Sequence, residues 1–281
     1  ARLSGEPEAV AVAIGEHYRP VAADDGLPRS PVGAVVALAD RADTLCAFSA
    51  MGLVPTGSED PYGLRRAALG VAAIAMSGVV KLRVRDLLGY AMEVLEQQSG
   101  LRVDAVGVRR QVADLIRSRA EFLMERREFD RDIVAAALGE DWDDLALALW
   151  RAEALSALRR GGRLEELAVA ATRVVNILRS REAEEVKGKW EAVAVDQALF
   201  TAEAEQHLYA ASRVVDKGLL ASDNPEDAYR ALQPLVVPVH RFFDEVLVMD
   251  TDLRLRVNRL ALLRLLAGHF ARLGDLSKIG A

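Results

Sequence analysis

Apolar residues recur at steps of three and four along nearly the whole chain, a spacing typical of amphipathic α-helices. Alanine, leucine, arginine and glutamate dominate these segments. The alternation of apolar and polar residues that marks a β-strand occurs only briefly, at 79–84, in a run too short and too charged to support a sheet. The pattern therefore predicts an all-α fold.

The expected helices fall into three blocks. Residues 1–83 form the first block, residues 84–162 the second and residues 163–281 the third. Gly161 and Gly162 mark the clearest internal break, because glycine readily ends a helix. Helices are expected over 6–18, 32–48, 62–76, 108–127, 130–138, 144–158 and 252–273, with loops or turns near 20–31, 52–61, 187–189, 222–225 and 233–234.

Composition narrows the class of protein. The 281 residues are 51% apolar, and their net charge of −6 argues against nucleic-acid binding over the whole surface while leaving room for a local basic patch. The single cysteine, Cys46, excludes an internal disulfide and favours a reducing, cytoplasmic compartment. The longest uncharged apolar run, 67–80, is shorter than the roughly 20 residues that cross a bilayer. We expect no signal peptide, and the missing initiator methionine suggests that the chain begins inside a longer protein.

The motifs of several enzyme classes are missing from the sequence. It contains no P-loop, no Gly-x-Ser-x-Gly elbow and no pair of Cys or His residues at zinc-ligand spacing, so no catalytic or metal-binding residue is assigned. Asp40 and Asp43 share one helix face and could hold a metal together with a neighbouring histidine. Pairing of this polar face with Arg41 or Arg65 is the favoured interpretation.

A distinctive loop over 55–61 precedes two arginines, Arg65 and Arg66. Asp60 is placed to cap the helix that Pro61 opens. Positive charge near a helix N-terminus is unfavourable to the helix dipole. The two arginines are therefore expected to serve either a carboxylate within the fold or a phosphate outside it, and the sequence does not decide between these.

Two basic features point to a nucleic-acid partner. Arg173, Asn176 and Arg179 lie within about a third of one helix circumference, a combination suited to phosphate and base-edge contacts. The segment from 251 onward carries six basic residues against two acidic ones, in a chain of negative net charge. Within it, Arg256 and Arg259 are close enough to hold one phosphate.

Seven stretches of the chain, in order, resemble the β-subunit of bacterial glycyl-tRNA synthetase. They are the residues 14–20 (IGEHYRP), 35–45 (VVALADRADTL), 52–70 (GLVPTGSEDPYGLRRAALG), 172–178 (TRVVNIL), 241–249 (RFFDEVLVM), 258–263 (NRLALL) and 271–277 (ARLGDLS). The matches span nearly the whole chain. Because the family's full subunit is much longer, the resemblance implies its C-terminal portion.

The resemblance also implies an architecture and partners. The first block would be the latter part of an HD-type helical domain, the second a helical connector, and the third a DALR-type anticodon-binding helical domain. The family's holoenzyme is a cytoplasmic heterotetramer in which the α-subunit attaches glycine to its tRNA with ATP and Mg²⁺. This fragment would bind glycine tRNA and the α-subunit while lacking the catalytic centre.

Site candidates follow from the residues and the resemblance together. Arg65 and Arg66 are candidates for contact with the other subunit or with RNA. Phe242 fits a core position better than a stacking platform. The candidates for tRNA contact are Arg173, Asn176, Arg179, Arg241, Phe242, Arg254, Asn258 and Arg259.

Two alternatives remain open at this point. One is an HD-type metal-dependent phosphohydrolase with a metal near His17 and Asp40, although the His-Asp dyad that defines active members does not occur here. The other is a purely structural subunit scaffold.

Overall fold

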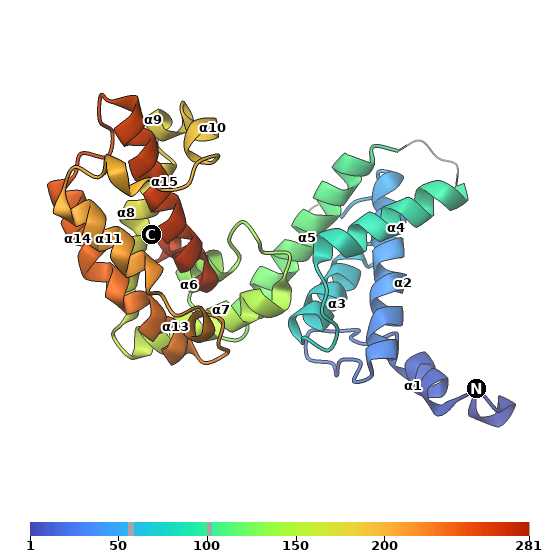
Figure 1. Ribbon diagram of the computed structural model, residues 1–281. Helices are drawn as coiled ribbons and strands as arrows, with labels where there is room; N and C mark the ends of the chain where they lie inside the picture. Colours follow the sequence, from blue (N-terminus) through green and yellow to red (C-terminus); the bar gives the residue numbers. More distant parts are fainter. Residues whose placement is uncertain (56–58, 100–102, 281) are drawn as a thin grey trace. The chain divides into compact units, whose positions relative to one another are not determined.

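Helices account for the regular structure of the computed structural model, which describes residues 1–55, 59–99 and 103–280 (Figure 1). These residues contain no β-strand, so the all-α prediction is confirmed. The chain divides into two units. The first comprises Ala1–Phe129 with Glu140–Leu149, and the second comprises Asp130–Gly139 with Trp150–Ala281.

The first unit is built on α2, a long helix against which its neighbours α1, α3, α4 and α5 pack. Ser30 caps α2 by accepting the amide of Gly33, and Pro31 occupies the first helical position, as expected for a strong helix start. The helices are α1 Glu8–Glu16, α2 Pro31–Ala50, α3 Leu64–Met76, α4 Val84–Ser99 and α5 Ala105–Glu125, preceded by a 3₁₀ turn Arg2–Ser4.

A buried arginine, Arg41 on α2, ties the end of α1 to this core. Its Nη1 donates to the carbonyl oxygens of His17 at 2.8 Å and Ala37 at 3.0 Å, and its Nη2 donates to those of Tyr18 at 2.8 Å and Pro20 at 3.2 Å. Its guanidinium thus binds carbonyl groups that the end of α1 leaves without helical partners. Asp40 acts on Arg41 through its charge, which raises the pKa of Arg41 against the larger lowering effect of burial, and the expected pairing of this face with Arg41 or Arg65 stays a prediction.

The second unit surrounds α15, which is buried along much of its length (Figure 1). This helix packs against α8, α10 and α11, and α14 covers α8 and α11. The helices are α6 Arg131–Ala137, α8 Leu164–Leu178, α9 Arg181–Glu184, α10 Lys187–Trp190, α11 Glu203–Arg213, α12 Lys217–Leu220, α13 Pro225–Leu232, α14 Val236–Glu245 and α15 Leu253–Phe270, with 3₁₀ turns Gln197–Leu199, Gln233–Leu235, Ala271–Leu273 and Leu276–Lys278.

The helix α7, Leu145–Arg160, ends at the Gly161-Gly162 break that the sequence predicts. Asp144 caps it, since its Oδ1 accepts the amide of Leu147 at 3.0 Å. Asp143, the residue before it, is buried and accepts a bond from Arg83 at 3.4 Å. In the described chain, no helix is long and apolar enough to cross a membrane.

The structure differs from the sequence-based expectation in two places. Residues 187–189, expected as a turn, lie in the short helix α10, because Trp190 is buried and its indole nitrogen donates to the carbonyl of Ala183 at 2.9 Å. The block 84–162, expected as a connector, is divided between the two units. Residues 56–58 of the expected 52–61 loop lie outside the described residues.

Candidate nucleic-acid interface

One face of α8 carries the polar residues that the sequence singles out. Leucine, alanine and valine side chains on the opposite face are buried, including Leu167 and Val174. This apolar stripe turns Thr172, Arg173 and Asn176 outward. The helix therefore presents hydroxyl, guanidinium and amide groups together, as its periodicity predicts.

Arg173 is held in a defined orientation by α14. Its Nη2 donates to Asp244 Oδ1 at 3.0 Å, and its Nη1 lies 3.0 Å from His240 Nδ1. Its guanidinium carbon lies 4.9 Å from the ring centroid of Phe243, a cation–π distance. Because the side chain is only partly exposed and is braced from three sides, it presents its remaining edge with little loss of entropy on binding.

A hollow of about 440 Å³ opens beside this face of α8. Arg159, Thr172, Arg173 and Asn176 border it, and Ile279 contributes an apolar wall from near the end of the described chain. An amide both donates and accepts hydrogen bonds, and apolar walls suit the flat faces of bases. The hollow thus combines the groups that recognise an unstacked nucleotide.

Arg159 borders the same hollow but is already engaged within the unit. Its Nη2 donates to Asp132 Oδ2 at 2.6 Å, and its Nη1 donates to Asp130 Oδ2 at 2.8 Å. The bond from Arg159 is the main reason that the pKa of Asp132 lies far below its usual range. Asp132 also accepts the amide of Gly280 at 2.9 Å, so this cluster fixes the wall of the hollow rather than offering free charge.

Arg179 follows the last residue of α8 and reaches a different neighbour. Its Nη2 donates to Asp275 Oδ2 at 3.0 Å and its Nη1 to Ser277 Oγ at 3.2 Å. The structure therefore does not direct Arg173 and Arg179 at one common point, although both lie on exposed or partly exposed positions of the same helix end.

Three of the predicted tRNA contacts are buried. Phe242 is completely inaccessible, in line with its interpretation as core, while Asn258 and Arg259 are 3% and 4% exposed. Asn258 clamps a loop, since its Oδ1 accepts the amide of Asp196 at 2.7 Å and its Nδ2 donates to the carbonyl of the same residue at 2.9 Å. These side chains are not on the surface that a nucleic acid could contact.

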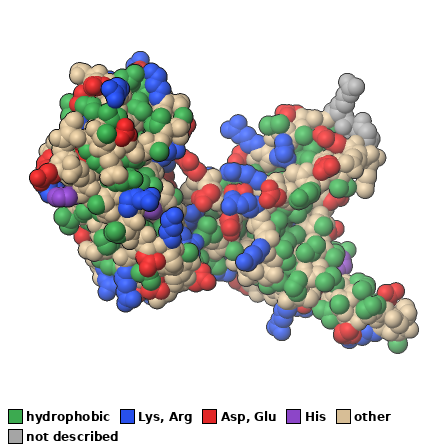
Figure 2. Space-filling view, in the orientation of Figure 1, with side chains coloured by type: hydrophobic (Ala, Val, Ile, Leu, Met, Phe, Trp, Pro, Cys, Tyr) green, Lys and Arg blue, Asp and Glu red, His purple; other side chains and the backbone are tan. Residues whose placement is uncertain are grey.

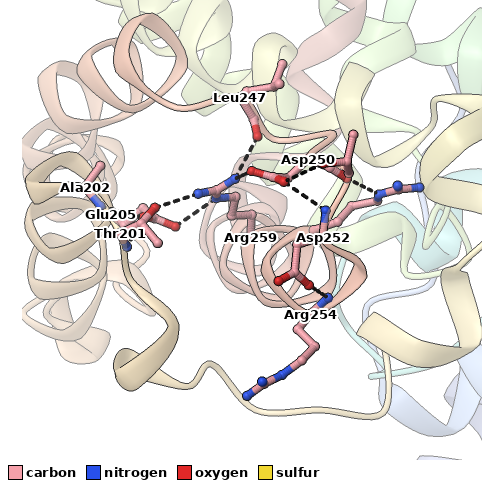
Figure 3. A network of polar contacts seen from close by, with 10 residues as sticks. Thr201, Ala202, Glu205, Leu247, Asp250, Asp252, Arg254 and Arg259 are labelled. Atoms are coloured by element: carbon pink, nitrogen blue, oxygen red, sulfur yellow. Dashed lines mark hydrogen bonds and ion pairs between the residues drawn. The ribbon is translucent and has the colours of Figure 1, made fainter.

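Arg259 is the centre of a polar network inside the second unit (Figure 3). Its Nε donates to Glu205 Oε1 at 2.9 Å, its Nη1 to Asp250 Oδ2 at 2.7 Å and to the carbonyl of Leu247 at 2.9 Å, and its Nη2 to Thr201 Oγ1 at 2.9 Å. The idea that Arg259 and Arg256 hold one phosphate is therefore wrong, because Arg259 serves two carboxylates of its own unit.

The network also sets the protonation of Glu205. Burial is the largest influence and would raise the pKa of this carboxyl, but it is outweighed by the bond from Arg259 and by the amides of Thr201 and Ala202. The resulting pKa of Glu205 lies below its ordinary value of 4.5. The bonds from Glu205 and Asp250 likewise outweigh burial and raise the pKa of Arg259, so the pair stays charged.

The last two candidates differ in their surroundings. Arg241 on α14 donates to Glu245 Oε1 at 2.7 Å and lies 2.7 Å from His207 Nδ1, so its charge is partly compensated. Arg254 is exposed, its side chain extends away from the polar network in Figure 3, and no ion pair is described for it in the residues that the structure covers. The start of α15 does not favour a positive charge, so Arg254 gains nothing from the helix dipole. Arg254 is therefore more available than Arg241 for contact with a phosphate.

The basic segment from 251 onward is used mostly for internal contacts. Arg256 donates to the carbonyl of Asp250 at 2.9 Å, and Arg264 donates to the carbonyls of Glu191 and Val193 at 2.7 Å and 3.0 Å. Arg272 donates to the carbonyl of Leu220 and stacks on Trp150 with its guanidinium carbon 3.9 Å from the ring centroid. The charge count of this segment therefore does not translate into an exposed basic patch, and Figure 2 shows Lys and Arg side chains interspersed with Asp and Glu on the visible face.

In the first unit, Asp60 and the two loop arginines have different surroundings, which do not decide between a carboxylate and a phosphate as the partner of the arginines. Asp60 accepts the amides of Leu64 and Arg65 at 2.8 Å and 2.9 Å, so it caps α3 as predicted. Arg65 donates to the carbonyl of Glu59 at 3.1 Å, and Arg66 is exposed. Arg66 is therefore the better placed of the two to meet a partner.

The residues proposed for a phosphohydrolase metal do not gather into a donor set. His17 bonds through Nδ1 to the carbonyl of Ile14 at 2.8 Å and stacks on Tyr18, while Asp40 is exposed on α2. Among the described residues, no group of three or more His, Cys, Asp or Glu side chains could hold a metal ion. The geometry thus offers the hydrolase interpretation no support.

Comparison with known proteins matches two family models to the chain. Residues 1–139 match the model of the glycyl-tRNA synthetase beta subunit, and residues 167–279 match that of the DALR anticodon binding domain. The chain belongs to the glycyl-tRNA synthetase beta-subunit family. Within this family member, the DALR match lies wholly inside the second unit and includes the hollow-lining residues of α8 from Ala168 onward.

Curated relatives agree with the family models along the whole chain. The glycine–tRNA ligase beta subunits of Anaeromyxobacter sp. and Syntrophus aciditrophicus are 39% and 37% identical to this beta-subunit chain over 286 and 284 residues, which cover 100% and 99% of it. That of Lactobacillus acidophilus is 33% identical over 279 residues. The chain spans 39% of the length of each of these relatives.

Sequence reasoning found the α8 face but missed the rest of the hollow. Ile279 and Gly280 come from a segment far from α8 in the sequence, Arg159 comes from the end of α7, and only folding brings them beside Asn176. The one available signal was the pair of basic residues 159–160 directly before the Gly161-Gly162 break, which marks a helix end with positive charge.

Proposed function

We propose that this chain is the tRNA-holding part of a glycyl-tRNA synthetase beta subunit, and that its second unit binds the anticodon arm of glycine tRNA. The observation that carries the proposal is the hollow beside Thr172, Arg173 and Asn176, inside the region that matches an anticodon-binding domain. Unstacked anticodon bases expose the edges and faces that amide, guanidinium and apolar groups recognise.

In this proposal the guanidinium of Arg173 has one role, and the amide of Asn176 and the hydroxyl of Thr172 share another. Arg173, braced by Asp244 and Phe243, stacks on a base or contacts the phosphate next to it. Asn176 and Thr172 hydrogen-bond to base edges, and the apolar wall excludes water from the bound base. Arg179, Arg241 and Arg254, which do not line the hollow, contact phosphates elsewhere along the bound RNA, and each contributes position rather than sequence discrimination.

The attachment of glycine would be carried out by the holoenzyme in the cytoplasm. We place ATP and Mg²⁺ on the α-subunit and assign this chain to RNA positioning and subunit assembly, with exposed Arg66 as a candidate for the latter. The family membership supports this division of labour, because the relatives of the chain are beta subunits of a ligase.

The test replaces Arg173 and Arg179 by glutamate in the 281-residue chain and measures binding of glycine tRNA by fluorescence anisotropy. We expect affinity to fall by about tenfold or more, since each arginine makes a charge-assisted contact. If the double variant is poorly folded, Asn176→Ala replaces it in the test, because this substitution alters an exposed side chain and should weaken tRNA binding without unfolding the chain. Arg230→Glu is the matched control, because Arg230 is an ion-paired surface arginine of the same unit outside the candidate set.

A second measurement separates RNA binding from chemistry in the assembled holoenzyme. With the same substitutions in the full-length beta subunit, we expect the KM for tRNA to rise while glycine-dependent exchange between ATP and pyrophosphate is retained, because that reaction needs no tRNA. Unchanged tRNA affinity in folded Arg173, Arg179 and Asn176 variants would exclude this face as the binding site.

A further inference from the structure

The first unit has a hollow of its own, of about 320 Å³, that the proposed anticodon contact does not use. It lies beside the first turn of α4, which provides Arg85 and Leu88, and along the first half of α5, which provides Arg109 and Arg110. Trp142, from the segment before α7, forms its remaining wall. Three guanidinium groups from two helices therefore border one concave site.

Two arginines of this hollow, Arg109 and Arg110, make no described ion pair with a carboxylate of the protein. Arg109 is exposed, its Nε donates to the carbonyl of Ala105 at 3.2 Å, and no bond of its two terminal nitrogens is described in the residues that the structure covers. Arg110 is exposed, and no carboxylate lies within ion-pair distance of it among the described residues. Such unpaired guanidinium forks match the oxygen geometry of a phosphate group.

Arg85 is held at the opposite border by an acidic neighbour. Its Nη2 donates to the carbonyl of Glu140 at 3.1 Å, and its Nη1 lies 3.9 Å from Asp143 Oδ1. Asp143 is nearly buried and is shared with Arg83, so it orients Arg85 without cancelling the charge of the hollow. The only carboxylate among the lining residues described is Asp114, against three arginines.

The floor of the hollow is apolar. Trp142 is only 6% exposed, and Arg117 covers part of its ring at 5.9 Å from the centroid. Together with Leu88, the indole provides a dry wall beneath the arginine border. Anions whose phosphate is attached to a less polar group, such as a ribose ring, fit both parts of this surface.

We infer that the first unit contains a phosphate-binding pocket formed by Arg85, Arg109 and Arg110 above Trp142. Its ligand is a phosphate group, provided either by a small phosphorylated molecule or by the backbone of an RNA. The pocket is independent of the α8 face, since all its residues belong to the first unit.

The pocket is tested on the 281-residue chain with two probes. Pyrophosphate binding is measured by calorimetry, and binding of a labelled single-stranded RNA of about ten nucleotides is measured by anisotropy. Arg110→Glu is compared with Arg127→Glu, an exposed arginine just beyond the other end of α5, about 25 Å along the helix axis. We expect Arg110→Glu to weaken binding of at least one probe by about tenfold and Arg127→Glu to leave it within about twofold.

A variant that should improve binding excludes an explanation by misfolding. Asp114→Asn removes the one lining carboxylate, so affinity for the same probe should rise by about threefold or more. An effect on pyrophosphate alone identifies a small phosphorylated ligand, and an effect on RNA alone identifies a nucleic-acid backbone. An effect on both supports a general phosphate pocket.

The inference is overturned if Arg110→Glu and Arg127→Glu change neither probe or change both equally, or if Asp114→Asn fails to strengthen binding. The RNA measurements are repeated in the background of Arg173→Glu and Arg179→Glu. An unchanged effect of Arg110→Glu there shows that the pocket acts separately, whether or not the anticodon proposal survives.

Discussion

Arg259 and Glu205 form an ion pair of 2.9 Å with side chains that are 5% and 1% exposed. The pair joins α15 to α11, and Asp250 and Thr201 complete the coordination of the guanidinium. A buried charge left without its partner costs far more than a broken surface pair. The stability of the second unit therefore depends on keeping both members.

The first prediction compares two arginines on the same helix. Arg259→Met leaves Glu205 buried without its main partner and should lower the free energy of unfolding of the second unit by about 3–5 kcal/mol. Arg254→Met removes an exposed side chain and should change it by no more than about 0.5 kcal/mol. Urea unfolding followed by tryptophan fluorescence measures both, and equal effects would contradict the assignment of Arg259 to the core.

The second prediction concerns acid. The pKa of Glu205 is lower in the folded state than its ordinary value of 4.5, so its contribution to stability is present above about pH 4.5 and is lost as pH falls through the folded value. Glu205→Gln should therefore destabilise the protein at pH 7, and its unfolding free energy should approach that of the wild type as the pH drops below about 4.5. Glu153→Gln, at an exposed position of α7, serves as the control and should run parallel to the wild type.

The third prediction uses two helical glycines with opposite surroundings. A Cβ at Gly70 would overlap the side chain of Arg41, which four hydrogen bonds hold in place, so Gly70→Ala should destabilise the first unit by about 1–3 kcal/mol. A Cβ at Gly89 would meet open space, so Gly89→Ala should stabilise it by about 0.5–1 kcal/mol. Thermal unfolding monitored by circular dichroism gives the two signs, and a stable Gly70→Ala protein would mean that Arg41 can move aside.

The fourth prediction uses Cys46 as a reporter of the first unit. Burial, aided by Asp43 and opposed by Arg109, raises the pKa of this thiol to about 12, so only about one molecule in ten thousand carries a thiolate at pH 8. The native protein should react with a disulfide reagent only after the first unit opens. The rate should rise in Gly70→Ala and stay unchanged in Arg259→Met, whereas rapid labelling of the native wild type would show that the thiol is accessible.

The helical periodicity was sufficient to predict several of the long helices, because an amphipathic helix repeats its apolar residues at steps of three and four, but it gave no range for α4. The starts of α2 and α8 lie next to Ser30-Pro31 and Gly161-Gly162, although Pro31 was expected in the loop before α2 rather than in the helix. Short helices such as α10 escaped prediction, since a single turn around Trp190 depends on a tertiary contact with Ala183 rather than on periodicity.

The candidate site shows a sharper limit. The side of α8 that carries Arg173 and Asn176 was predictable from angular spacing alone. The sequence could not predict whether an arginine faces solvent or binds an oxygen atom of its own unit. It shows the charge of the side chain but not the partner atom that folding brings to it. Arg259 and Asn258 were accordingly chosen for RNA and found in the interior.

The internal use of arginine affects how strongly RNA binding depends on the salt concentration. The guanidinium groups of Arg256, Arg259 and Arg264 already bind oxygen atoms of their own unit, so they are not available to neutralise phosphates and release the cations condensed on an RNA. Each phosphate newly neutralised contributes about 0.9 to the slope of log affinity against log salt on duplex DNA and about 0.7 on a single strand. A chain this rich in arginine should consequently bind its RNA with a shallow salt dependence, set by the few side chains that remain unengaged.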